Sequence, residues 1–393
     1  MVSVPLYELK DFGDIKRFYL LLGPACNMHC RHCSQSPEKG SCGSFSPVVS
    51  PKTLATVKNY IAYRSSDRKR AEHSILVFWG GEPLVYWDLL KSLIVELDDR
   101  SLDFGKFRFG ITTNGTLLDE EKVAFLNEHN VLVIFSYDAP HPFAVRGYVS
   151  DDVCALVRKL KRYFVSSTGS AYNCDQLLAV RCLRAKFPNS LKYNVFAWTR
   201  FTFPVPEDLY GYDWDLVRES IRKIRVGAQL DDGDALRLAG LYVSYFRLGI
   251  NKDFDAPLLQ CVPGVGYFNL TLDGKIPICH NGDNFFATVD DTMPVVLERA
   301  KSINDRLKNR QCADCGCRYF CPGCCFFDYY DADGKSVTCE KFRKRFYRIV
   351  EEELSLLGRP VTDEETAWFR EQEALMDKQV EEFLSEGRKY ADK

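Results

Sequence analysis

Three closely spaced cysteines near the start of the chain are the residues whose type and spacing point most directly to chemistry. They occur in the stretch Cys26-Asn-Met-His-Cys30-Arg-His-Cys33, which follows the apolar run RFYLLL (17–22). Cysteine thiolates bind zinc and iron–sulfur clusters. A [4Fe–4S] cluster normally takes four thiolates, so three of them leave one iron open to a substrate or cofactor. The alternative is a structural zinc site, although such sites usually use paired Cys-x2-Cys motifs.

The distribution of the cysteines favours metal binding over disulfides. Ten of the sixteen fall in two groups, Cys26, Cys30 and Cys33, then Cys312, Cys315, Cys317, Cys321, Cys324, Cys325 and Cys339. The first residues lack the apolar core and cleavage site of a signal peptide, and no apolar run reaches the roughly 18 residues of a membrane span. We therefore expect a cytoplasmic protein that binds no membrane and keeps its cysteines reduced.

The rest of the chain must provide a scaffold for these cysteines. A length of 393 residues with 46% hydrophobic residues allows a large core, and a net charge of −2 gives no basic excess for binding nucleic acid. Short apolar runs alternate with amphipathic stretches, which is typical of βα units around a parallel sheet. The predicted strands are 17–22, 74–79, 107–112, 131–136, 177–184 and 193–198, and the predicted helices are 51–66, 86–99, 119–129, 151–164, 215–226 and 234–248. This order predicts an α/β fold, a partial (β/α)6 TIM-like barrel, with the cysteines at the carboxyl end of its first strand.

Polar residues follow the next three predicted strands. Gly80-Gly81-Glu82-Pro83 follows the second, Thr112-Thr113-Asn114-Gly115 closes the third, and Ser136-Tyr137-Asp138 closes the fourth, with Arg146 a few residues on. Glycines allow close backbone approach, and the Glu82 carboxylate suits an ammonium group. Ordinary turn and cap chemistry is the alternative for these positions.

The three-cysteine motif after the first strand and Gly-Gly-Glu-Pro after the second together resemble the radical S-adenosylmethionine (SAM) superfamily. The resemblance implies a [4Fe–4S] cluster on Cys26, Cys30 and Cys33, whose open iron binds SAM. One electron then cleaves SAM to a 5′-deoxyadenosyl radical that abstracts hydrogen from a substrate. The implied SAM-binding residues are His32, Gly80, Gly81, Glu82, Pro83, Thr113, Asn114, Ser136, Asp138 and Arg146. His32 stands where the family usually has an aromatic residue, and its planar ring can stack on adenine.

The carboxyl-terminal cysteines are similar to the seven-cysteine SPASM extension of radical SAM enzymes. The pattern is Cys261-x12-Gly274-x4-Cys279, then Cys312-x2-Cys315-x5-Cys321-x3-Cys325, then Cys339. The resemblance implies two auxiliary [4Fe–4S] clusters and thus three clusters in all. It assigns Cys312, Cys315, Cys321 and Cys339 to one auxiliary cluster and Cys261, Cys279 and Cys325 to the other.

The second set is one ligand short, and the sequence leaves its completion open. The fourth ligand could be Cys317, Cys324, a non-cysteine ligand or the substrate. Because Cys317 and Cys324 lie outside the seven-cysteine pattern, free thiols near the clusters are the favoured alternative for them. His280 follows Cys279 where sulfatase maturases have an aspartate that accepts a proton. A histidine titrates near neutrality, so His280 is a candidate base, with a cluster neighbour or ligand as the alternative.

The resemblance also implies a domain order and a class of reaction. We expect an amino-terminal segment (1–16), a radical SAM barrel (17–255), a SPASM domain (256–345) that includes a hairpin at Asp273-Gly274, and a helical tail (346–393). Auxiliary clusters can take an electron from a product radical, which favours an oxidative maturase that forms a thioether or carbon–carbon cross-link in a ribosomally made precursor peptide.

Alternatives and partners follow from the same resemblance. The alternative reactions are oxidation of a protein side chain and dehydrogenation of a small alcohol or aminosugar. A non-catalytic iron–sulfur electron carrier or zinc scaffold would also bind metal, but Gly-Gly-Glu-Pro argues against it. An electron donor such as ferredoxin or flavodoxin is expected. Because 25 residues precede Cys26, we expect the leader of a precursor to be recognised by a separate protein, the barrel or the tail.

The cluster assignment predicts the iron content of the protein. Anaerobically reconstituted protein should hold roughly twelve irons per chain, or roughly eight if one auxiliary site stays empty. Iron and sulfide analysis measures this directly. A zinc scaffold would instead hold zinc and no labile sulfide.

Overall fold

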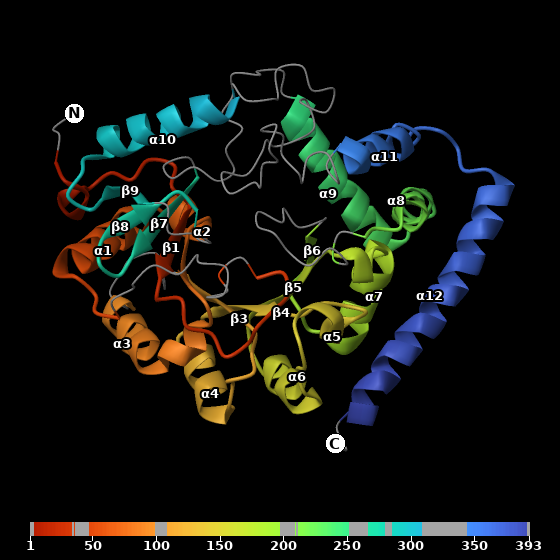
Figure 1. The fold of residues 1–393 in the computed structure, drawn as a ribbon, viewed down its shortest axis with the longest axis horizontal. Helices are drawn as coiled ribbons and strands as arrows, with labels where there is room; N and C mark the ends of the chain where they lie inside the picture. The colour runs from red at the N-terminus through yellow and green to blue at the C-terminus, as the bar shows by residue number, and fades with distance from the viewer. Residues whose placement is uncertain are drawn as a thin grey trace.

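A parallel sheet of seven strands forms the centre of the protein (Figure 1). The computed structural model describes residues 4–33, 35, 47–98, 108–196, 209, 211–250, 266–279, 285–308 and 344–390. The strands are β1 (Arg17–Leu21), β2 (Ile75–Trp79), β3 (Phe109–Thr113), β4 (Leu132–Ser136), β5 (Tyr163–Thr168), β6 (Tyr193–Phe196) and β7 (Tyr267–Thr271), in the order β6-β5-β4-β3-β2-β1-β7. Every neighbouring pair is parallel, so the carboxyl ends of all seven strands lie at one edge.

Helices connect the strands and cover the outer side of the curved sheet (Figure 1). They are α1 (Pro51–Ser65), α2 (Arg68–Glu72), α3 (Trp87–Leu97), α4 (Glu120–Glu128), α5 (Pro142–Val145), α6 (Asp151–Arg158), α7 (Gln176–Lys186), α8 (Trp214–Gln229) and α9 (Gly233–Ile250), with 3-10 turns η1 (Leu6–Glu8), η3 (Pro83–Tyr86) and η4 (Ala171–Asn173). Side-chain caps fix many helix starts; Ser50, Asp119 and Asp175 each accept a backbone N–H of the first turn. The predicted α/β partial barrel is confirmed, with β7 as an additional edge strand.

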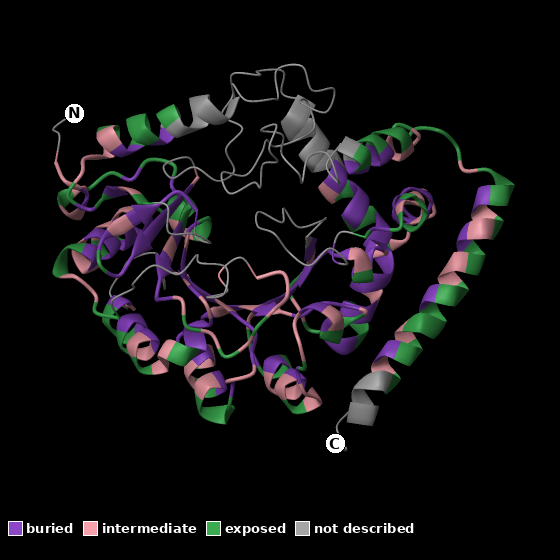
Figure 2. Cartoon of the chain, in the orientation of Figure 1, coloured by how far each residue is buried: buried purple, intermediate pink, exposed green. Residues whose placement is uncertain are grey.

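The core lies between the sheet and the helices (Figure 2). All six residues of β5 and all five of β7 are buried. Phe18 of β1 packs on Phe268 of β7 and on Tyr60 of α1, with ring centroids 5.3 and 4.8 Å apart. These contacts hold β7 against the sheet, although it follows β6 by many residues in the chain.

The prediction of a strand at 177–184 is wrong. These residues lie inside α7, and the fifth strand is β5, which overlaps the end of the predicted helix 151–164. Helix α7 is covered by the sheet on one side and by later helices on another, so most of its residues are buried and its run of apolar residues imitates a strand. Conversely, β5 ends in Ser166, Ser167 and Thr168, whose hydroxyls hide the pattern of a buried strand.

The turn at Asp273-Gly274 forms, but not within a simple hairpin. Gly274 has a φ of +90° and its N–H donates to the Thr271 carbonyl at 3.1 Å. Strand β7 then pairs with β1, whereas β8 (Lys275–Pro277) pairs antiparallel with β9 (Phe285–Thr288), which leads into α10 (Met293–Lys308). The amino-terminal segment joins this unit, because the Leu6 N–H donates to the Val289 carbonyl at 3.0 Å.

The carboxyl-terminal tail consists of α11 (Lys344–Leu354) and α12 (Asp363–Tyr390), which pack against the barrel helices α7 and α8. Arg225 of α8 is buried at the centre of this contact. Its guanidinium lies 3.3 Å from Glu353 and 2.8 Å from Glu365, so one cation joins three helical elements. Among the described helices, none is both long and apolar enough to cross a membrane.

Replacing Arg225 should therefore destabilise the protein strongly. Arg225→Met removes the buried cation shared by Glu353 and Glu365 and leaves the buried Glu365 with only the exposed Arg359, so we expect it to lower the free energy of unfolding by about 3 kcal/mol. Urea denaturation followed by circular dichroism measures the loss. The control is Arg370→Met on the exposed face of α12, where the ion pair with Glu373 is solvated and we expect a loss of less than about 0.5 kcal/mol. Equal losses in the two variants would contradict this account.

Candidate functional site

The cysteine loop lies against the segment that follows β2. Three main-chain hydrogen bonds join them: Leu22 N–H donates to the Trp79 carbonyl at 2.8 Å, Gly81 N–H to the Gly23 carbonyl at 2.9 Å, and Glu82 N–H to the Ala25 carbonyl at 2.8 Å. Ala25, the acceptor of the last bond, is the residue directly before Cys26. The Gly-Gly-Glu-Pro segment therefore positions the start of the cysteine motif.

Gly80 and Gly81 are required by this close contact. A Cβ atom at Gly80 would lie 2.3 Å from the Gly23 carbonyl oxygen, and Gly80 has a φ of +153°. A Cβ atom at Gly81 would lie 2.3 Å from the Pro24 oxygen and 2.4 Å from the Ala25 oxygen. These are backbone atoms that cannot rotate away. The sequence predicted close backbone approach at these glycines, and the described partner is the cysteine loop itself.

Glu82 connects the segment after β2 to the end of β3. Its carboxylate is buried and accepts three hydrogen bonds, from Leu84 N–H at 3.0 Å, Thr113 Oγ1 at 2.7 Å and Asn114 N–H at 2.7 Å. Burial raises the pKa of Glu82 to about 7, although all three donors act in the opposite direction. Glu82 thus fixes the segment after β2 relative to the end of β3, and both segments are predicted to bind SAM.

The end of β3 also reaches the cysteine motif. Asn114 Nδ2 donates to Asn27 Oδ1 at 3.0 Å and lies 4.0 Å from the Cys26 sulfur. The Asn27 amide in turn donates to Thr116 Oγ1 at 2.7 Å. These contacts fix the second residue of the motif against the third strand.

The far end of the motif is attached to α5, after β4. Arg31 donates its main-chain N–H to the Val145 carbonyl at 2.9 Å and its guanidinium to the Ala144 carbonyl at 3.0 Å. The Cys33 N–H donates to the Cys30 carbonyl at 3.0 Å, which closes a turn. The motif therefore spans the carboxyl ends of the first four strands.

Asp138 and Arg146 form a buried ion pair beside this turn. The Arg146 Nε lies 2.8 Å from Asp138 Oδ2, and Arg146 Nη2 donates to Thr168 Oγ1 at 3.0 Å. Asp138 Oδ1 accepts the Thr168 N–H at 2.7 Å. The pair connects the end of β4 to the end of β5. Burial raises the pKa of Asp138, and Arg146 opposes this shift.

The three motif thiols are partly buried and influence one another. Burial raises the pKa of Cys26 and raises the pKa of Cys30 to about 11, with the positive charge of Arg146 acting against the second shift. Within the described residues, no three or more His, Cys, Asp or Glu side chains converge as ligands of a single metal ion. Each thiolate of an iron–sulfur cluster binds a different iron, so convergence on one point is not required. Three thiols on one loop therefore fit an iron–sulfur cluster. Their raised pKa values do not oppose this, because metal binding displaces the thiol protons.

The remaining predicted site residues are placed as follows. His32 is half-buried on the cysteine loop, Pro83 begins η3, and Ser136 is the last residue of β4. Cys279 is buried just beyond β8. Cys261, His280, Cys312, Cys315, Cys321, Cys325 and Cys339 lie outside the described residues.

Sequence reasoning missed three residues that shape the site. The Tyr86 hydroxyl accepts the Ala25 N–H at 2.8 Å, Asn27 joins the motif to β3, and Thr168 joins Asp138 to Arg146. Tyr86 lies four residues after Glu82, and Asn27 lies inside the motif, so proximity to a motif was an available signal. Thr168 gave no such signal, because its strand was not recognised.

Comparison with known proteins agrees with this geometry. The model of the radical SAM superfamily matches residues 20–174, which run from β1 through η4. The matched part of the chain contains both the cysteine motif and the Gly-Gly-Glu-Pro segment. The superfamily match indicates an enzyme, and it implies a [4Fe–4S] cluster and SAM as cofactors.

Relatives and solved structures extend the similarity beyond the radical SAM domain. The radical SAM cyclopropyl synthase TigE of Paramaledivibacter caminithermalis is 21% identical over 370 residues, which cover 87% of this chain and 75% of TigE. The fold is similar to that of anSMEcpe with bound AdoMet, with a TM-score of 0.55 and 17% identity over 90% of this chain and 98% of that one. SuiB of Streptococcus suis bound to S-adenosylmethionine gives a TM-score of 0.50 and 12% identity, over 80% and 74% of the two chains. These solved structures share the fold.

The contact between Gly81 and the cysteine loop gives a direct test. Gly81→Ala places a methyl group closer to two backbone oxygens than van der Waals contact allows, so the loop must move and Cys26 with it. We expect reconstituted Gly81→Ala protein to lose about four irons per chain, the content of one cluster. The control is Gly240→Ala in α9, where no atom of the described residues outside the local helix backbone lies within 4 Å of an added Cβ. It should keep its iron and gain about 0.5–1 kcal/mol of stability. Full iron content in Gly81→Ala would contradict the role of this glycine.

Proposed function

We propose that the protein is a radical SAM maturase that abstracts hydrogen from a precursor peptide and forms a cross-link by oxidation. The observation that carries the proposal is the attachment of the cysteine loop to the Gly-Gly-Glu-Pro segment at the carboxyl edge of the sheet. That edge is where α/β barrels place their chemistry. The match of residues 20–174 to the radical SAM superfamily supports it.

The residues divide into cluster ligands and SAM-binding residues. Cys26, Cys30 and Cys33 would hold the [4Fe–4S] cluster, which supplies the electron that converts bound SAM to the hydrogen-abstracting radical. The ends of β2 to β5 would bind and orient SAM, because their polar residues are already fixed by mutual hydrogen bonds. Preorganised polar groups of this kind need little rearrangement on binding.

Two auxiliary clusters complete the proposal. Cys279, which is buried just beyond β8, would be a ligand of one of them. Its strand is joined to β7 at the first turn after the sheet, since the Asn269 amide of β7 donates to the Pro277 and Ile278 carbonyls at 3.4 and 3.3 Å. An auxiliary cluster at this position would lie beside β7. His280, the next residue, is the proposed base.

The similarity to TigE favours a carbon–carbon bond as the product. TigE is named a cyclopropyl synthase, and closing a cyclopropane ring forms a carbon–carbon bond with loss of two hydrogens. A peptide as substrate is supported by a solved anSMEcpe structure of similar fold that contains a bound peptide, with a TM-score of 0.52. A reduced ferredoxin or flavodoxin would supply the electron for SAM cleavage.

The motif cysteines give the test of the radical chemistry. Cys26→Ala, Cys30→Ala and Cys33→Ala should each abolish the formation of 5′-deoxyadenosine from SAM and dithionite, because each removes a ligand of the SAM-binding cluster. Chromatography of the quenched reaction measures the product. The control is Cys154→Ala, which removes a buried cysteine in α6 outside the motif and should leave SAM cleavage intact. Persistent cleavage in the three motif variants would reject the assignment.

The substrate class is tested separately. Precursor peptides encoded beside the gene, incubated with reconstituted enzyme, SAM and dithionite, should lose two mass units, and tandem mass spectrometry should place the new bond. A modified sulfatase or a dehydrogenated aminosugar, with no change in any peptide, would replace the maturase proposal by one of its alternatives.

A further inference from the structure

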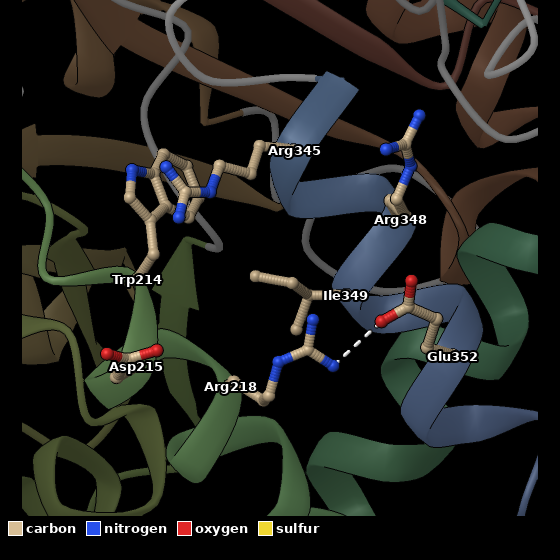
Figure 3. A pocket seen from close by; sticks show the side chains of 7 residues that line it. All are labelled: Trp214, Asp215, Arg218, Arg345, Arg348, Ile349 and Glu352. Carbon is tan, nitrogen blue, oxygen red and sulfur yellow. Dashed lines mark hydrogen bonds and ion pairs between the residues drawn. The ribbon is translucent and has the colours of Figure 1, made fainter.

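A cavity of about 480 Å³ lies between the start of α8 and the face of α11 (Figure 3). Its floor includes the buried side chain of Ile349. Three arginines line it, Arg218 from α8 and Arg345 and Arg348 from α11. The radical SAM motifs do not include any of these residues, and the cavity is separate from the cysteine loop and the polar residues around it.

The charges of the cavity are only partly neutralised. Arg218 is paired with Glu352 at 2.7 Å, as the dashed line in Figure 3 indicates. Arg345 instead lies on the indole of Trp214, with 4.8 Å from its guanidinium carbon to the ring centroid. Within the described part of the chain, Arg348 has no acidic partner. Among the described residues, two guanidinium groups therefore remain available to an anion, and Asp215 is the acidic residue of the lining without an ion pair.

The cavity lies toward the carboxyl edge of the sheet, as the cysteine loop does. The backbone of Asp213, the residue before α8, lies near the Cys174 sulfur and opposes the rise that burial causes in the pKa of that thiol. Cys174 closes the η4 turn, in which the Asn173 amide donates to the Thr168 carbonyl at 2.8 Å. Thr168 is the last residue of β5 and contacts Arg146. A continuous series of contacts thus runs from the cavity to the polar residues proposed to bind SAM.

We propose that this cavity binds an acidic side chain of the substrate peptide and so holds the peptide at the rim of the reaction site. The proposal rests on the proposed function for the peptide nature of the substrate. It adds to that function a recognition site between α8, a helix of the barrel, and α11, a helix of the carboxyl-terminal tail.

A peptide carboxylate fits the chemistry of this cavity. The planar guanidinium presents paired donors that match the two oxygens of a carboxylate. The cavity volume is within the range of sites that bind small groups. A phosphate backbone would need a longer series of cations than two free arginines.

The test measures binding to the full-length reconstituted enzyme. The probe is a fluorescein-labelled peptide that contains eight glutamates, and a peptide with eight glutamines in their place is its partner. Arg348→Glu and Arg345→Gln should each weaken binding of the glutamate peptide about 10-fold. Both side chains are exposed, so Arg348→Glu should leave the melting temperature unchanged, and Arg345→Gln, which loses the contact with Trp214, should lower it only slightly. The control is Arg68→Glu on α2. It makes the same charge change as Arg348→Glu but lies outside the cavity, and the Arg68 side chain is 80% exposed. It should bind the peptide like the wild type.

Four results would overturn the proposal. They are undetectable binding to the wild type, equal binding of the glutamine peptide, an equal loss in Arg68→Glu, and displacement by inorganic phosphate at the concentration of glutamate side chains. The last would indicate a general anion site. Because the measurement needs no turnover, it stays separate from the proposed function: an enzyme that binds the glutamate peptide through Arg348 but never modifies a peptide fails only the latter.

Discussion

The cysteine loop can lie against the segment after β2 only because Gly80 and Gly81 have no side chains. The main chains of the two segments approach so closely that a methyl group at either glycine would overlap carbonyl oxygens of the loop. The loop has few apolar residues of its own, so hydrogen bonds to its neighbours must determine its path. The positions of Cys26, Cys30 and Cys33 therefore depend on a contact between two main chains.

From this contact, a network of buried polar groups spreads along the carboxyl edge of the sheet. Glu82 joins the ends of β2 and β3, and the Asp138–Arg146 pair joins the ends of β4 and β5 through Thr168. Burying such groups costs free energy unless each finds partners. The cost explains the raised pKa values of Glu82 and Asp138, whose charged forms burial disfavours. The apolar core beneath, formed by strands such as β7, supports an edge that is built for binding.

Sequence patterns predicted the parts of this arrangement that local physics determines. The strands β1 to β4 and β6 are apolar runs bounded by polar residues, and Gly80 to Pro83 stand out as a motif. The fifth βα unit was misread, because burial on several sides removes the periodicity of α7 and because Ser166 to Thr168 satisfy their hydroxyls through long-range partners. Tyr86 and Thr168 could not be predicted to contact the site, since their partners come from segments distant in the chain. The pairing of β7 with β1 is likewise a tertiary property.

The tail helices are attached by the same principle of shared buried charge. Arg225 holds α11 and α12 against α8, and this attachment places Arg345 over Trp214 at the start of α8 and Arg348 in the lining of the same cavity. A buried ion pair contributes less to stability than an apolar contact of similar size, but it specifies one arrangement, because any other leaves a charge unpaired. The basic cavity and the cysteine loop are thus both fixed by groups that tolerate few alternative positions, and both lie toward the carboxyl ends of the strands. A peptide held by α8 and α11 would therefore reach the cysteine loop along a rigid edge of the barrel.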